Sequence, residues 1–234
     1  MTKGPRIALI SALAQSPGPA AAAMSEAWPQ ARFHNLLDDS LAGDLATLGA
    51  ITPGIVERFL ALGRYAAAAG AETEPTAGVM FTCSAFRPAI DRVRAALAIP
   101  VVSPNEGAFE EALAYCAGRP AGGTIALMLT FAGSLAPLID EVHAIAALRG
   151  QDLPRVDGIV ADGALAALQS GEGATHDRIV AAAASRIASA DVVVIGQFSM
   201  ARAAAAVAAT VHAPLLTTPH AAVRKLRSMV EASA

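Results

Sequence analysis

The sequence predicts an α/β fold made of two similar halves, each a parallel four-stranded sheet covered by helices. Short β-branched or apolar runs alternate with longer alanine-rich stretches, which is typical of parallel sheets. With 234 residues, of which 54% are hydrophobic, the chain is long enough for two packed cores. Segments of the first half also recur in the second half, as expected for a duplicated unit.

The first strand is predicted from "RIALISAL", an apolar run that ends before the turn residues Gln15, Ser16 and Pro17. The complete set of predicted strands is 6–13, 32–37, 77–82, 99–103, 123–130, 155–160, 191–196 and 213–218. The predicted helices between them include 53–70, 87–97, 105–117, 134–149, 175–189 and 200–209. A final helix at about 219–232 is expected to pack on the first half, since chain termini often lie close together.

The repeat aligns Cys83 with Gln197, because the spacing between these two residues equals the spacing between Pro100 and Pro214. We therefore predict two domains related by a pseudo-twofold axis. The first comprises residues 1–104 and 218–234, and the second comprises residues 105–217. Further matching segments are 7–19 with 125–137, and 38–48 with 161–171.

Composition excludes several classes of function. The net charge is −3 and the sequence has no basic block, so nucleic-acid binding is not expected. No apolar run reaches the ~20 residues that span a bilayer, so a membrane partner is not expected either. Two cysteines, Cys83 and Cys116, make no disulfide framework, and a cytoplasmic location is expected. No metal-ligand spacing or nucleotide-binding motif occurs, so we predict neither metal nor cofactor. Whether the chain forms a homo-oligomer is left open.

Ligands of parallel α/β sheets bind beyond the carboxyl ends of the strands, and Cys83 stands at such an end. The helix predicted to follow it begins near Arg87 and Pro88. A thiol before a helix N-terminus faces free N–H groups, which would favour the thiolate. The alternative is a buried core cysteine, and that interpretation is preferred for Cys116, in a helix.

Other candidate site residues follow the carboxyl ends of the predicted strands. Hydroxyl and backbone N–H groups there could bind a substrate carboxylate, or could simply cap helices. Gln197 cannot exchange a proton near neutral pH but could orient a substrate. Asn105 and Glu106 are interpreted as a helix cap with an acid in the first turn. The predicted substrate-binding residues are Ser11, Thr82, Ser84, Ala85, Thr130, Gln197, Phe198, Ser199 and His220.

The sequence resembles the Asp/Glu racemase superfamily, which includes glutamate, aspartate and hydantoin racemases, maleate isomerase and arylmalonate decarboxylase. The resemblance is carried by "FTCSAF", "HNLLDDSLAGDL", "IPVVSPNEGAFEEAL" and "VVVIGQFSMARA" and covers nearly the whole chain. It implies two pseudo-symmetric, Rossmann-like domains with the active site in the cleft between them. It also implies cofactor-independent chemistry on a small carboxylate.

In this family each domain typically offers a cysteine at the end of a central strand. Cys83 matches the first position, whereas the usual Gly-Cys of the second is Gly196-Gln197 here. The resemblance therefore implies a racemase or isomerase that works with one catalytic thiol, Cys83, rather than two; alternatively, a residue such as His220 or Glu106 replaces the missing thiol. A single-thiol decarboxylase of the arylmalonate type is the alternative, because one thiol suffices to protonate an enediolate. A non-catalytic protein that binds small carboxylates is a third interpretation.

Overall fold

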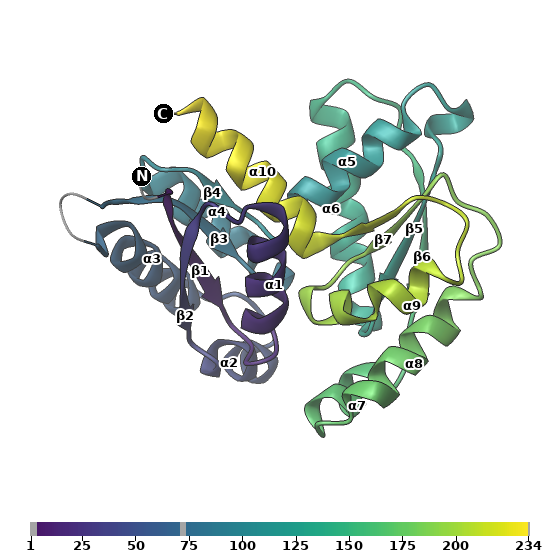
Figure 1. The fold of residues 1–234 in the computed structure, drawn as a ribbon, viewed down its shortest axis with the longest axis horizontal. Helices are drawn as coiled ribbons and strands as arrows, with labels where there is room; N and C mark the ends of the chain where they lie inside the picture. Colours follow the sequence, from purple (N-terminus) through teal and green to yellow (C-terminus); the bar gives the residue numbers. More distant parts are fainter. Residues whose placement is uncertain (1–3, 71–73, 234) are drawn as a thin grey trace. The chain divides into compact units, whose positions relative to one another are not determined.

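The computed structural model describes residues 4–70 and 74–233, which form two compact units (Figure 1). The first unit comprises residues 1–104 and 222–234, and the second comprises residues 105–221. Each unit is a parallel four-stranded sheet covered by helices, so the predicted fold class is confirmed. None of the helices in the described part of the chain is both long and apolar enough to cross a membrane.

The sheet of the first unit has the strand order β2-β1-β3-β4, and all its pairs are parallel. Its strands are β1 (Arg6–Ser11), β2 (Arg32–Leu37), β3 (Thr76–Phe81) and β4 (Val101–Val102). Its helices are α1 (Pro17–Ala27), α2 (Ser40–Leu48), α3 (Pro53–Ala68) and α4 (Arg87–Ala96). The last helix of the chain, α10 (Thr218–Ala232), begins in the second unit and continues into the first.

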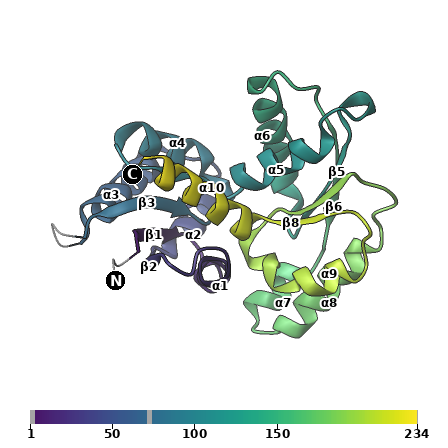
Figure 2. The same ribbon diagram turned by 45° about the horizontal axis from the view of Figure 1, so that its top comes forward.

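Side chains alternate between the two faces of this sheet. Val79 and Phe81 of β3 pack with Phe59 of α3 and Ile90 of α4. Gly78 faces the other way, where the absence of a side chain leaves room for α10. A Cβ atom at Gly78 would lie 2.9 Å from Leu226 and 3.1 Å from Val230, both on α10. The final helix therefore packs closely on the first sheet, as Figures 1 and 2 show.

The sheet of the second unit has the same topology, with the order β6-β5-β7-β8. Its strands are β5 (Thr124–Leu129), β6 (Arg155–Val160), β7 (Val192–Ile195) and β8 (Leu215–Thr217). Its helices are α5 (Glu106–Cys116), α6 (Leu135–Leu148), α7 (Ala164–Gln169), α8 (Gly173–Ala184) and α9 (Ala204–Ala208). Helices α5 and α6 cover one face, where Leu127 and Val194 are buried, and α7, α8 and α9 cover the opposite face.

The strand registers reproduce the repeat that the sequence predicts. Ala8 pairs with Val79 in the first sheet, and Ala126 pairs with Val193 in the second. Val79 pairs in turn with Val101, and Val193 pairs with Leu215. These pairings follow the sequence alignment that places Gln197 on Cys83, so the two residues occupy corresponding positions in the two units.

The observed helix boundaries differ from the predicted ones after β3 and after β7, where the chain first forms 3-10 turns. The helix predicted at 200–209 is a 3-10 helix, Phe198–Ala203, followed by the single short helix α9. The predicted helix near Arg87 is likewise preceded by a 3-10 turn, Ser84–Phe86. Tighter 3-10 turns are common at the start of α-helices, and here each one directly follows a candidate site residue.

Candidate functional site

The carboxyl end of the first sheet brings together Ser11, at the end of β1, and Thr82, which follows β3. The Thr82 hydroxyl donates to the Ser11 hydroxyl at 2.9 Å, and the Thr82 N–H donates to the Ile10 carbonyl at 3.1 Å. Both side chains are buried. Their hydroxyls therefore fasten two adjacent strand ends together directly beside Cys83.

Cys83 follows Thr82 in an extended conformation, with φ −123° and ψ 117°, and precedes the 3-10 turn Ser84–Phe86. The residue is partly exposed and packs against the core of the first unit. Burial raises the pKa of the Cys83 thiol to about 11, and a hydrogen bond from the Ala85 backbone N–H acts in the opposite direction with a smaller effect. The thiol is therefore protonated at neutral pH.

This result corrects the expectation that a helix N-terminus would favour the thiolate of Cys83. The α-helix does not begin directly after the thiol, because α4 starts only at Arg87 and a 3-10 turn lies between. The effect of a helix dipole is confined to its first turn, so desolvation decides the pKa of this thiol. Ser84 is half-buried and Ala85 is exposed on the same turn.

Gln197 occupies the corresponding place in the second unit, after β7 and before the 3-10 helix Phe198–Ala203. Its Oε1 atom accepts hydrogen bonds from the Thr130 backbone N–H at 2.8 Å and from the Thr130 hydroxyl at 2.7 Å. A backbone N–H can only donate, so the atom facing it is the amide oxygen. The Nε2 group of Gln197 is consequently directed elsewhere, as a donor.

The two residues that follow Gln197 differ in exposure. Phe198 is buried, with 2% of its surface exposed, and Ser199 is half-buried. Gly196, which precedes Gln197, passes so close to β5 that an added Cβ would lie 3.1 Å from the Met128 carbonyl oxygen. The turn that carries Gln197 is thus held against the end of β5 by close packing and by Thr130.

His220 lies in the first turn of α10, after the end of β8. Its Nδ1 atom is 2.7 Å from the Thr217 hydroxyl, and the tautomer of the ring decides which of the two donates. Among the described residues there is no group of three or more His, Cys, Asp or Glu side chains that could hold a metal ion.

Two residues at the carboxyl end of the second sheet, Asn105 and Thr218, are not among the predicted site residues. Asn105 stands at the start of α5, but its side chain makes no capping hydrogen bond, so its interpretation as a helix cap is wrong. Its side chain is 1% exposed, and neither amide atom has a hydrogen-bond partner in the described structure. The hydroxyl of Thr218, at the start of α10, is also fully buried and without a partner there. The strand-end segments "SPNE" and "TTPH" were the available signal.

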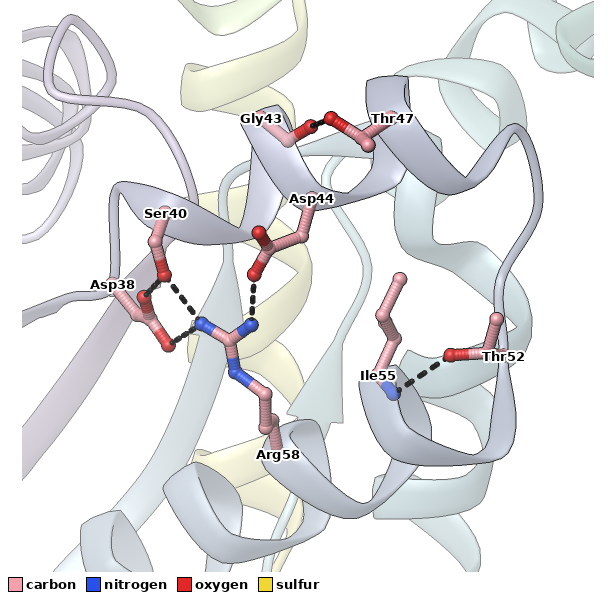
Figure 3. A network of polar contacts seen from close by, with 8 residues as sticks. All are labelled: Asp38, Ser40, Gly43, Asp44, Thr47, Thr52, Ile55 and Arg58. Atoms are coloured by element: carbon pink, nitrogen blue, oxygen red, sulfur yellow. Dashed lines mark hydrogen bonds and ion pairs between the residues drawn. The ribbon is translucent and has the colours of Figure 1, made fainter.

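A different polar network lies beyond β2 in the first unit and is shown in Figure 3. Arg58 of α3 donates to Asp38 and Ser40, both at 2.6 Å, and to Asp44, and Ser40 donates to Asp38 at 2.7 Å. Desolvation acts to raise the pKa of Asp38, but the hydrogen bonds from Ser40 and Arg58 together outweigh it, so the pKa lies below its ordinary value. This network ties α2 to α3.

A hollow in the second unit lies at the opposite, amino end of its sheet. It is bordered by Cys116, Arg119 and Gly122, which precede β5, and by Gln151 and Asp152, which precede β6. None of the predicted site residues lines it. Cys116 itself is 3% exposed and belongs to the hydrophobic core, in agreement with its interpretation as a core cysteine.

Solved structures of similar fold are racemases and a decarboxylase. A glutamate racemase from Bacillus anthracis has a TM-score of 0.68 at 11% identity, over 100% of this chain and 84% of that one. An allantoin racemase from Klebsiella pneumoniae has a TM-score of 0.67 at 19% identity, over 98% of this chain and 89% of that one. A glycine-to-cysteine mutant of arylmalonate decarboxylase, in a sulfate-associated form, has a TM-score of 0.62 at 16% identity, over 98% and 95%.

At these identities the structures show a shared fold. A comparison with curated protein sequences finds no match for this chain. A family model for Asp/Glu/hydantoin racemases, by contrast, matches residues 51–227, a range that includes both Cys83 and Gln197. The chain therefore belongs to the Asp/Glu/hydantoin racemase family, which consists of racemases and related isomerases.

Proposed function

We propose that this protein is a cofactor-independent racemase or isomerase-type enzyme that moves a proton at the carbon next to a carboxylate. The substrate is a small carboxylic acid or an amino-acid derivative, and Cys83 is the thiol that exchanges the proton. The observation that carries this proposal is the position of Cys83, partly exposed at the carboxyl end of the central strand β3. Membership of the racemase family supports it.

The surroundings of Cys83 suggest how a substrate could be held there. The Thr82 hydroxyl is engaged with Ser11, and the Ala85 N–H is engaged with the thiol. Ser84 is half-buried next to the thiol, and its hydroxyl can donate to a substrate carboxylate. Ser11 and Thr82 then act as supports that fix the strand ends on which Cys83 and Ser84 stand.

The protonation state of the thiol limits what one thiol can do. With a pKa of about 11, Cys83 is a thiolate in only ~10⁻⁴ of molecules at pH 7. The thiol is therefore almost always in the protonated form that can donate a proton, and only rarely in the thiolate form that could remove a weakly acidic α-proton from a free amino acid. The corresponding residue of the second unit, Gln197, has no proton to exchange at this pH. Substrates with an activated carbon are consequently favoured.

These two observations also favour a second candidate, a decarboxylase of the arylmalonate type. In that reaction the bond between the α-carbon and one carboxylate breaks and carbon dioxide leaves. The electron pair of the broken bond stays on the α-carbon and delocalises into the remaining carboxylate, which gives an enediolate. The Cys83 S–H then protonates the carbon, and solvent returns a proton to the thiolate. This sequence needs one proton donor on one face and no second base.

Proton exchange in heavy water distinguishes these reactions. A panel of aspartate, glutamate, hydantoins and substituted malonates is incubated with the protein, and deuterium at the α-carbon and released carbon dioxide are followed by NMR. Exchange without carbon dioxide supports the isomerase, and deuterium incorporated with carbon dioxide release supports the decarboxylase. Cys83→Ala should abolish either activity and Cys116→Ser should preserve it. Activity that survives Cys83→Ala would overturn both proposals, and binding without turnover would favour a non-catalytic protein.

A further inference from the structure

Five buried side-chain polar atoms of the second unit have no hydrogen-bond partner among residues 4–70 and 74–233: one on Gln151, one on His176, two on Asn105 and one on Thr218. Asn105 is 1% exposed and leaves both its Nδ2 donor and its Oδ1 acceptor unpaired. Thr218 is 0% exposed and leaves its hydroxyl unpaired. Buried polar groups in folded proteins are nearly always hydrogen-bonded, because an unpaired one costs free energy. Two at one end of a unit require an explanation.

Both residues lie at the carboxyl end of the second sheet. Thr218 directly follows β8, and β8 pairs with β7 so that Thr217 lies beside Ile195, two residues before Gln197. Helix α5 packs against β7 and β8, and it begins at this end of the sheet, because helices run antiparallel to the strands of a parallel sheet.

The starts of α5 and α10 are also neighbours. Ala108 and Phe109 from the first turn of α5 belong to the same buried cluster as Ala221 from the first turn of α10. The first turns of these two helices lie side by side in Figures 1 and 2. Asn105 and Thr218, which stand at these two starts, therefore border the same region.

The unpaired groups define the chemistry of a ligand. The Asn105 amide offers a donor and an acceptor side by side, and the Thr218 hydroxyl can do either. A carboxylate accepts hydrogen bonds but cannot donate one to Asn105 Oδ1. A neutral carboxamide offers both a carbonyl oxygen and an N–H group and meets every one of these requirements.

We propose that Asn105 and Thr218 form a binding site for the carboxamide group of a small ligand, at the carboxyl end of the second sheet. The site discriminates a carboxamide from the carboxylate of the same shape, because only the carboxamide pairs both atoms of the Asn105 amide. A structural role would instead pair these groups within the protein, as happens at Thr76. That buried threonine hydroxyl lies 2.7 Å from the Ala66 carbonyl oxygen and 2.9 Å from that of Ala69.

Binding of succinamate and of succinate, which differ only in one carboxamide, tests the site by titration calorimetry. The Cys83→Ala variant serves as the parent protein, so that the outcome is independent of the proposed activity. Succinamate should bind at least about tenfold more tightly than succinate, and Asn105→Leu should remove that preference. Thr218→Val should weaken binding of succinamate several-fold. Equal binding of the two probes, or no binding of either, would overturn the proposal.

Thermal unfolding separates a ligand site from a structural one. Thr218→Val removes a hydroxyl that has no internal partner, so the unfolding midpoint should stay the same or rise. Thr76→Val is the matched control, and by removing a paired hydroxyl it should lower the midpoint by about 2–4 °C. If Asn105→Leu and Thr218→Val lower the midpoint as Thr76→Val does while leaving succinamate binding unchanged, the two residues have a structural role and the proposal is wrong.

Discussion

Gln197 receives two hydrogen bonds from Thr130 on a single atom, its Oε1, with the backbone N–H at 2.8 Å and the hydroxyl at 2.7 Å. This arrangement fixes the plane of the Gln197 amide and directs its oxygen toward Thr130. The position that corresponds to Cys83 in the second unit is thereby occupied by a side chain that is held in place and cannot titrate. Gln197 thus has a definite structural role in addition to any role in ligand binding.

Replacing Gln197 by Leu should lower the free energy of unfolding by about 1–2 kcal/mol, because the Thr130 N–H and hydroxyl lose their shared acceptor. Gln197→Glu keeps an acceptor oxygen of the same reach and should cost less. Urea denaturation followed by circular dichroism measures both. If the two variants are equally stable, the bonds to Thr130 do not stabilise the fold.

Alkylation of Cys83 by iodoacetamide should accelerate with pH well beyond the range of an ordinary thiol. The thiolate is the reacting species, and burial raises the pKa of Cys83 to about 11. A Cys116→Ser background isolates the signal, and the logarithm of the rate should still rise with unit slope between pH 7 and pH 9.5. A plateau near pH 8 would show that the thiolate is stabilised after all.

The ion pair between Arg58 and Asp38 should stabilise the fold at neutral pH and lose its effect in acid. The pKa of Asp38 lies below its ordinary value of 3.8, so the folded state favours the carboxylate. This stability is present above that ordinary value and is lost as pH falls through the lower pKa of the folded state. Both side chains are partly exposed, at 36% for Arg58 and 26% for Asp38, so the contribution is modest.

Arg58→Met should therefore cost about 0.5–1 kcal/mol at pH 7 and progressively less as pH falls below 3.8, measured by urea denaturation. A loss that is the same at pH 7 and pH 3 would mean that Arg58 acts through packing of its aliphatic stem rather than through its charge.

The sequence predicted all eight strands and the internal repeat. Strands of a buried parallel sheet are short apolar runs, and both the runs and their spacing can be recognised in the sequence. The prediction failed where backbone conformation decides what a side chain can reach. Asn105 stands at a helix start, yet it has αR backbone angles and its side chain does not cap the helix. Thr52 has the extended backbone that a cap requires, and its hydroxyl accepts from the Ile55 N–H.

The pKa of Cys83 was mispredicted for a related reason. A helix start close to the cysteine is visible in the sequence, whereas burial depends on residues from distant parts of the chain. The core around Cys83 includes Phe59 and Phe86, and of these only Phe86 is a neighbour in sequence. Desolvation by such contacts is a tertiary effect, and it outweighs the local one here.

Glycine-to-alanine substitutions at Gly196 and Gly43 should have opposite effects on stability. A Cβ at Gly196 would lie 2.9 Å from Leu127 Cδ1 and 3.1 Å from the Met128 carbonyl oxygen, and the latter belongs to β5 and cannot move aside. Gly196→Ala should therefore lower the free energy of unfolding by about 1–3 kcal/mol and displace the turn that carries Gln197.

Gly43 is an exposed residue inside α2 with nothing within 4 Å of an added Cβ, so Gly43→Ala should stabilise the fold by about 0.5–1 kcal/mol. Urea denaturation of the two variants measures both effects, and a stable Gly196→Ala variant would show that the close approach of Gly196 to β5 is not required.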